Sequence, residues 1–413
     1  MFLAVCFLIL CFCFLLYISN IRTKFLLLPI VYLSVCIYTI IGTELFTFAK
    51  NVPFDFYDDI KGNDYFYVYL YYLLASFSFY IGIYAVKKFK VSSISINLNV
   101  NTKILIKDSY IYFCYFLTLL LLHLGHGVEH LYFRYGYTLN GAGNTTFRIL
   151  YTIFLPFTSL LLPFVKNKWL RLFLTAFLYI LVQGTSSRNL VIIPSCYLLG
   201  SLIRDSRIIF TKSIVLLFLI GFSVTLAMQY RYNDYQGVWP NIVFFINYGI
   251  DTKFMTLAIN YLSSYSIFAT AVTLDVHSFD FKSMLLSINP MPSNFIDIEY
   301  MIDSQKLNIN SPFPAIAILA LGGWPLVLSY YFFSGVIWTY FGDYLARGSK
   351  VLSIFVVMLF VLFTVLSLQY NLRGVTRFTY YLIALCVLLK LLKILKFNYK
   401  KYKCRNTGDL SEK

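Results

Sequence analysis

Long apolar runs recur along this sequence from Met1 to Leu395, with only short polar breaks between them. A soluble domain cannot cover so much apolar surface, because only 13% of the residues are charged whereas 59% are hydrophobic. Runs of this length match the hydrocarbon thickness of a bilayer when they form helices. The sequence therefore predicts an all-α polytopic membrane protein and excludes a soluble globular one.

The apolar runs and the charges that bound them predict about 11 transmembrane helices, within a range of about 10 to 12. The predicted spans are 2–19, 25–42, 65–86, 109–124, 148–165, 169–184, 189–203, 208–229, 315–342, 351–369 and 377–396. The segment 312–342 is either one span or a re-entrant turn followed by a helix.

One further apolar run, Phe254 to Val272, contains Asn260, Ser263, Ser264 and Ser266. Polar residues on one side of an apolar helix suit the headgroup plane, so we expect an interfacial helix here. This helix then lies in one large extracytoplasmic loop. The predicted parts of the chain are an N-terminal membrane bundle of about eight spans (1–229), the extracytoplasmic loop (230–311), about three C-terminal spans (312–396) and a basic cytoplasmic tail (397–413).

The distribution of charge predicts the orientation of these spans. Lysine and arginine stay on the cytoplasmic side of short loops, and with the tail inside the inner segments hold 23 basic and 5 acidic residues. The outer segments hold the remaining 11 basic and 13 acidic residues. The N-terminus is then outside and the C-terminus cytoplasmic. Topology explains the net charge of +16, so the sequence calls for no nucleic-acid partner.

Several arginines break this rule by lying on the predicted outer face. They are Arg134, Arg148, Arg188, Arg231, Arg373 and Arg377. Such arginines either anchor to lipid headgroups or bind a diphosphate bidentately. At Arg188 the second interpretation is favoured, because the preceding Gly184-Thr-Ser-Ser turn opens a helix whose N-terminus attracts anions. Arg373 and Arg377 are four residues apart around Gly374, so a helix would present both on one face.

Histidines supply the candidate general bases. His123, His126 and His130 occur within eight residues, but Gly125 and Gly127 interrupt the helix that would gather them around a metal. We therefore expect no metal here, and either a general base or a hydrogen-bonded structural cluster. His277 lies alone in the large loop.

The first predicted outer loop is acidic. Its carboxylates are Glu44, Asp55, Asp58, Asp59 and Asp64. Acidic residues accumulate outside without any function, so a solvated loop is the simpler interpretation. The alternative is a base or metal ligand, because this composition resembles transferases that use lipid-linked sugars.

The arrangement resembles the Wzy-type polymerases of O-antigen and capsule repeat units, which are multi-span membrane proteins. The resemblance covers the whole chain as a pattern: the number of spans, the Thr185-Ser-Ser-Arg188 turn that opens a span, the dominant outer loop, and the Pro- and Gly-rich segment Ser311-Pro-Phe-Pro to Leu321-Gly-Gly-Trp324. Some relatives carry an arginine, ten residues and then a glycine. Here eleven residues separate Arg188 from Gly200, so Arg188 corresponds by position only.

The resemblance implies metal-independent glycosyl transfer at the outer leaflet of the bacterial cytoplasmic membrane, without a cofactor. The partners implied are an undecaprenyl-diphosphate-linked oligosaccharide, the lipid bilayer and, as a candidate, a chain-length regulator. We expect Arg188, with Arg231, Arg373 or Arg377, to bind the diphosphate as it leaves. His277, or His126 with His130, is the candidate base, and His277 is favoured because related ligases place a histidine in such a loop.

Two alternatives remain. An O-antigen ligase performs nearly the same chemistry on a different acceptor, and the sequence does not separate the two. A flippase for lipid-linked oligosaccharides would share the substrate and the arginines. A flippase needs charge along a path through both leaflets, whereas this sequence keeps its charges at one face.

Overall fold

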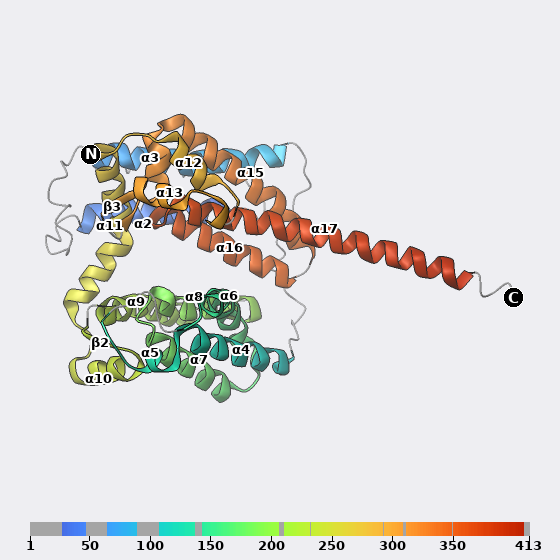
Figure 1. Cartoon of the computed structure of the whole chain (residues 1–413), viewed down its shortest axis with the longest axis horizontal. Helices are drawn as coiled ribbons and strands as arrows, with labels where there is room; N and C mark the ends of the chain where they lie inside the picture. Colours follow the sequence, from blue (N-terminus) through green and yellow to red (C-terminus); the bar gives the residue numbers. More distant parts are fainter. Residues whose placement is uncertain are drawn as a thin grey trace. The chain divides into compact units, whose positions relative to one another are not determined.

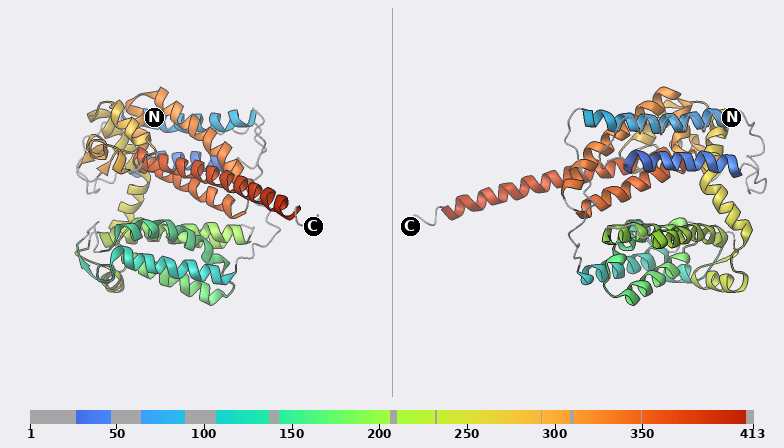
Figure 2. Two further views of the ribbon diagram at one scale, coloured as in Figure 1. Left: turned by 45° about the vertical axis from the view of Figure 1, so that its right-hand side comes forward. Right: turned by 180° about the vertical axis from the view of Figure 1, so that it is seen from behind.

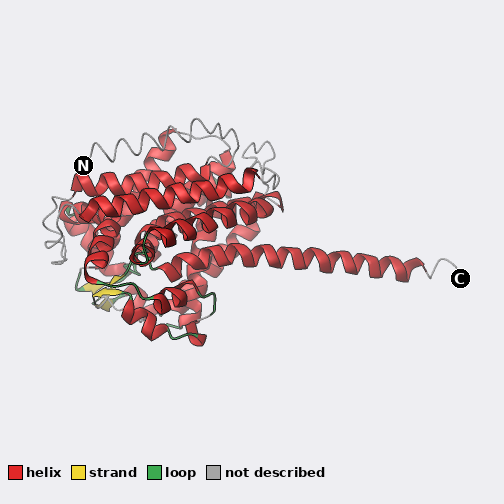
Figure 3. Cartoon of the chain, turned by 90° about the horizontal axis from the view of Figure 1, so that it is seen from above, coloured by secondary structure: helices red, strands yellow, loops and turns green. Residues whose placement is uncertain are grey.

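The computed structural model describes residues 27–46, 64–88, 107–136, 143–205, 210–231, 233–291, 293–308, 311–348 and 350–408. Helices make up nearly all of this part of the chain, and the strands form two short antiparallel pairs (Figure 3). The prediction of an all-α protein is thus confirmed for the described residues. The predicted first span, 2–19, lies outside them.

The chain forms two compact units. Unit 1 consists of residues 1–96 and 263–413, and unit 2 consists of residues 97–262. This division differs from the predicted one, because the helices before residue 97 pack with the C-terminal helices and the segment 230–311 is shared between the units.

Unit 2 is a helical bundle with one strand pair. Its helices are α4 (Asp108–His126), α5 (Val128–Tyr132), α6 (Thr145–Leu161), η3 (Leu162–Phe164), α7 (Lys168–Gln183), η4 (Arg188–Val191), α8 (Ile192–Asp205), α9 (Phe210–Arg231) and α10 (Val238–Tyr248), labelled for the most part in Figure 1. Buried side chains of α4, α6, α7 and α9 form its core. Strands β1 (Arg134–Tyr135) and β2 (Tyr235–Gln236) pair so that Arg134 faces Gln236. The end of unit 2 that carries them is called the strand end below.

Unit 1 contains the remaining elements. They are α2 (Leu27–Phe46), α3 (Asp64–Lys88), the second half of α11 (Thr252–Val276), α12 (Phe281–Ile288), η5 (Ser293–Phe295), α13 (Ile298–Ser304), β3 (Lys306–Asn308), β4 (Ser311–Pro312), α14 (Ala315–Leu321), α15 (Trp324–Gly348), α16 (Lys350–Gln369) and α17 (Leu372–Gly408). Figure 2 shows the blue helices α2 and α3 among the orange and red helices of this unit.

Two glycines explain why α3 packs with a helix about 250 residues later in the chain. A Cβ on Gly82 would lie 2.2 Å from the carbonyl oxygen of Phe332, and one on Gly335 would lie 2.3 Å from that of Phe79. Small residues let helix backbones approach this closely, which is how helices associate in lipid. This reciprocal contact draws the N-terminal helices into unit 1.

The apolar helices support a membrane-embedded protein. Four described helices are long and apolar enough to cross a membrane, or five if a bent pair in α11 counts as one span. The four are Tyr65–Val86, Asp108–His126, Thr145–Phe164 and Leu372–Leu392. A helix also occupies each predicted span from 25–42 onward. In the segment 312–342 the chain breaks at Gly322–Gly323 between α14 and α15.

A helix forms where the interfacial helix is expected, but three of its serines are buried. α11 bends by 55° between Thr252–Ala258 and Ser263–Val276. Ser263, Ser264 and Ser266 are at most 1% exposed within unit 1, so the prediction that they face the headgroups is wrong. Other hydroxyls of this segment bond to the helix itself: Thr270 donates to the Ser266 carbonyl and Thr273 to the Ala269 carbonyl.

Candidate functional site

The turn before Arg188 has an unusual backbone. α7 ends at Gln183, residues Gly184 to Ser187 form a turn, and η4 begins at Arg188. Ser186 has a φ of 47°, and it is the one non-glycine residue with a positive φ in the described part of the chain. A side chain in this left-handed region costs about 1–2 kcal/mol, so the surroundings must hold it there.

Arg134 of β1 donates hydrogen bonds to this turn. Its Nη1 donates to the Gly184 carbonyl at 2.8 Å and its Nη2 donates to the Thr185 carbonyl at 3.1 Å. Nη2 also donates to Gln236 Oε1 at 3.0 Å, and Nη1 to the His130 carbonyl at 3.2 Å. The residue is 7% exposed. One buried guanidinium therefore joins the turn, the strand pair and α5.

Asn241 of α10 also donates hydrogen bonds to this turn. Its Nδ2 donates to the Gln183 carbonyl at 2.8 Å and to Ser186 Oγ at 3.3 Å. A Cβ on Gly184 would lie 2.6 Å from the carbonyl oxygen of Leu131, so a larger residue does not fit here. Side-chain donors thus occupy the carbonyls of Gln183, Gly184 and Thr185, and the turn has little freedom to move.

Arg188 and Arg231 lie at the same end of unit 2. Arg188 opens η4, with Ser187 as its N-cap. Arg231 is the last residue of α9 and is exposed, and its carbonyl accepts a bond from Gln236 of β2. The opposite end holds Arg171 and Arg204, whose guanidinium groups donate to the carbonyl of Pro163.

The histidines of unit 2 form a structural cluster at the strand end. The His123 ring bonds to the Leu119 carbonyl at 2.7 Å and to the Tyr132 hydroxyl at 3.3 Å. The His126 ring packs edge-on against Tyr151 at 5.6 Å, and its Nε2 is buried with no hydrogen-bond partner among the described residues. Among all residues that the structure describes, no three His, Cys, Asp or Glu side chains are arranged to hold a metal.

The surroundings of His130 also favour its uncharged form. Burial lowers its pKa, and the positive charges of Arg134 and Arg148 lower it further. A neutral imidazole can accept a proton from a hydroxyl, which is what a general base must do.

In unit 1 the predicted site residues lie around α12 and the start of α17. Arg373 is 4% exposed, and it donates to the carbonyls of Leu286, Asn289 and Met291 at 2.6–3.1 Å. These bonds engage the last orphan carbonyls of α12 and its following loop. Arg377, one turn later, is half-buried and donates to Ser293 Oγ at 3.3 Å.

The third predicted residue of unit 1, His277, follows α11 directly. Its ring lies 4.7 Å from that of Phe313, and its backbone N–H bonds to the Thr273 carbonyl.

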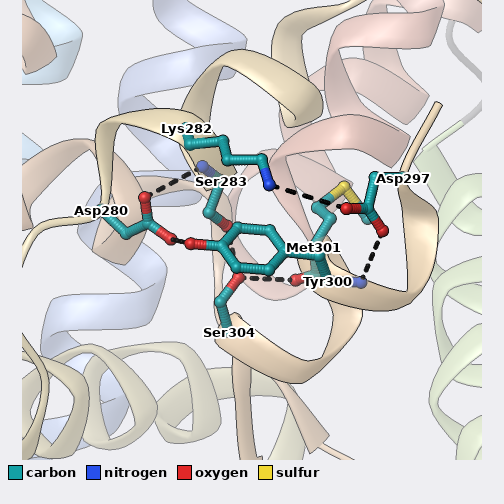
Figure 4. A network of polar contacts seen from close by, with 7 residues as sticks. All are labelled: Asp280, Lys282, Ser283, Asp297, Tyr300, Met301 and Ser304. Atoms are coloured by element: carbon teal, nitrogen blue, oxygen red, sulfur yellow. Dashed lines mark hydrogen bonds and ion pairs between the residues drawn. The ribbon is translucent and has the colours of Figure 1, made fainter.

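A polar network on α12 and α13 did not emerge from the sequence (Figure 4). The Tyr300 hydroxyl donates to Asp280 at 2.7 Å, and Lys282 lies 3.9 Å from the Tyr300 ring centroid and 3.6 Å from Asp297. Burial raises the pKa of Asp280, but the bonds from Tyr300 and from the backbone N–H groups of Ser283 and Lys282 outweigh it and lower that pKa. The one available signal was that Asp280 and Asp297 each precede a short helix as an N-cap.

The structure thus sorts the predicted residues into two groups. Arg188, Arg231, His126 and His130 belong to the strand end of unit 2, whereas His277, Arg373 and Arg377 belong to unit 1. Their assigned roles remain predictions. Sequence reasoning noted Arg134 only as an outer charge and did not consider Asn241, because a strand pair of two residues per strand leaves no periodic signal.

Comparison of the chain with protein-family models, with curated proteins and with solved structures found no match.

Proposed function

We propose that this chain polymerises undecaprenyl-diphosphate-linked oligosaccharide repeat units into O-antigen or capsular polysaccharide. The observation that supports this most directly is the held turn before Arg188. Backbone strain kept in place by buried donors is typical of sites where a following group must be positioned. An arginine that follows such a turn suits a diphosphate, because a guanidinium can bind its oxygens while staying charged.

The proposed reaction is a metal-independent glycosyl transfer. An acceptor hydroxyl attacks the anomeric carbon, the bond from that carbon to the diphosphate oxygen breaks, and the electron pair leaves with the diphosphate. Arg188 and Arg231 of unit 2 stabilise the developing charge on the diphosphate. Arg373 and Arg377 of unit 1 are the alternative diphosphate-binding pair. The Arg373 donors are directed at backbone carbonyls, so Arg377 is the stronger candidate of these two.

A histidine takes the proton of the acceptor hydroxyl in this mechanism. His130 and His277 are the better candidates, because the Nε2 of His126 is buried against Tyr151. His130 is supported by its lowered pKa and His277 by its position after α11.

The proposed setting is the bacterial cytoplasmic membrane. The helices span it about 11 times, with the N-terminus outside and the C-terminus cytoplasmic. The segment 230–311 then forms the extracytoplasmic loop, and a chain-length regulator is a candidate partner.

The test is deletion of the gene in its host, with the surface polysaccharide run on a gel and the lipid-linked intermediates extracted. Complementation with R188A should leave single repeat units at the surface, whereas K253A, which removes an exposed charge from unit 2, should restore the full ladder. Long polymer that accumulates on the lipid carrier would instead indicate a ligase. Unextended repeats trapped at the cytoplasmic face would indicate a flippase and overturn the arginine mechanism.

A further inference from the structure

Arg134 makes more hydrogen bonds than its place on a two-residue strand requires. A strand pair this short is held by few backbone bonds, and the fork of Arg134 adds four side-chain bonds to three other segments. Two of the four acceptors are the carbonyls of Gly184 and Thr185, just before the strained Ser186.

We propose that Arg134 is a positioning residue for Arg188: it fixes the turn from which Arg188 starts η4, and thereby the backbone position from which Arg188 binds a diphosphate. This inference rests on the proposed function, because it assigns a purpose to the turn only if Arg188 binds the leaving group. It also assigns a supporting role to Asn241, which holds the Gln183 carbonyl.

The geometry requires an arginine at position 134. The two guanidinium nitrogens bind four acceptors that belong to α5, the turn and β2, and a planar fork presents these donors in fixed directions. A lysine carries the same charge on a single nitrogen at the end of a flexible stem, so it cannot reproduce the two separate nitrogens that bind the Gly184 carbonyl on one side and the Thr185 carbonyl and Gln236 on the other. The substitution R134K therefore keeps the charge and removes the alignment.

The turn responds to this loss because Ser186 prefers another backbone conformation. Without the two Arg134 bonds, the left-handed φ of Ser186 loses part of what keeps it in place, and the chain from Gly184 to Arg188 can relax. A misplacement of about 1 Å at a binding group is enough to cost about 100-fold in a reaction that depends on orientation. Glycine adopts a positive φ without strain, so S186G should make the held conformation less dependent on Arg134.

The test uses the purified full chain in detergent and measures binding of undecaprenyl diphosphate, with inorganic pyrophosphate as competitor. We expect R188A and R134K each to weaken binding by about 10-fold or more, since each loses charge-assisted bonds at the site or their alignment. The double variant R134K/S186G should recover part of this loss, and K253A should bind as the wild type does. N241D, which removes the Nδ2 donor but keeps the size of the side chain, should weaken binding in the same direction. The thermal unfolding midpoint and the tryptophan fluorescence of each variant show that it is folded.

The outcomes separate the two proposals. If R188A loses binding while folded R134K and N241D bind as the wild type does, Arg134 has no positioning role and the proposed function stands. If R188A itself binds as the wild type does, the diphosphate clamp in unit 2 is wrong, and the role of Arg134 falls with it. Should R134K not fold, N241D and the double variant N241D/S186G test the same turn. Weakened binding in N241D that S186G partly restores supports the positioning role of the turn, and folded N241D that binds as the wild type does overturns it.

Discussion

Arg134 in unit 2 and Arg373 in unit 1 are both buried arginines that donate to backbone carbonyls. Each is associated with a second arginine: Arg188 follows the turn that Arg134 binds, and Arg377 lies one helical turn after Arg373. Arg134 binds acceptors from three segments and secures a turn with a left-handed serine, directly before Arg188. Arg373 binds three carbonyls of a single segment, at the end of α12 and in the loop after it. The first arginine joins separate elements, whereas the second completes the end of one helix.

This difference predicts how each unit responds when its arginine is lost. When the buried acceptors belong to several elements, they cannot all find new hydrogen-bond partners. A backbone shift that gives one carbonyl a new donor exposes or strains another element. Acceptors at the end of one helix can turn toward solvent together if the loop moves. We therefore expect loss of Arg134 to destabilise unit 2 as a whole and loss of Arg373 to loosen one loop.

The largest effect is expected for R134M, which keeps the volume and removes every donor. Leaving the carbonyls of Gly184 and Thr185 buried without partners should cost about 3–5 kcal/mol, as for other broken buried charge networks. The measurement is the temperature at which Cys196 of unit 2 becomes reactive to a thiol reagent, compared with Cys36 of unit 1, each as the sole cysteine; both are buried in the folded chain. Equal shifts at the two cysteines would contradict a unit-specific role.

A smaller effect is expected for R373M. Its three carbonyls lose charged donors, but the segment that bears them can move, so about 2–3 kcal/mol of local rather than global stability should be lost. Trypsin cleavage after the exposed Lys282 reports this opening and should accelerate.

R377M is the matched control for R373M, because Arg377 makes a single long bond to Ser293 Oγ. It should leave the rate of cleavage after Lys282 near that of the wild type. Faster cleavage in R377M than in R373M would reverse the roles assigned to the two arginines.

The comparison of Arg134 with Arg373 also shows which features of the fold and of the site the sequence predicts. The apolar runs predicted helices at the right places, because helix length and apolar composition suffice for that. The same reasoning grouped Arg373 with Arg377 as ligand-binding, since residues four apart share a helix face. It could not see that α12, some 85 residues earlier in the chain, lies against Arg373. Nor could it assign α3 to unit 1, because the reciprocal approach of Gly82 and Gly335 depends on backbone positions that no local pattern encodes.

Glycine substitutions sharpen the comparison further. In G184A the new Cβ would meet the backbone oxygen of Leu131 at 2.6 Å, which cannot move alone, and overpacking of this kind costs about 1–3 kcal/mol. In G374A the nearest atoms belong to the ring of Tyr370, an exposed side chain that can rotate away. Alanine also favours the helix there by up to about 1 kcal/mol. We expect the unfolding midpoint to fall in G184A and to stay or rise in G374A, and the opposite order would show that the turn in unit 2 is the more adaptable site.

The smallest effect is expected at Asp280 of unit 1, because its hydrogen bond with Tyr300 is exposed to solvent. Its pKa is lowered in the folded chain, so the stability it contributes is present above the unfolded pKa of about 4 and is lost as the pH falls through the lower folded value. Solvent screening limits this contribution to below about 0.5 kcal/mol. The unfolding midpoint of the wild type should therefore fall slightly more between pH 6 and pH 3 than that of D280N, with the two converging at the acidic end. A gap as large as that caused by R134M would mean that the α12–α13 network, and not Arg373, holds this loop in place.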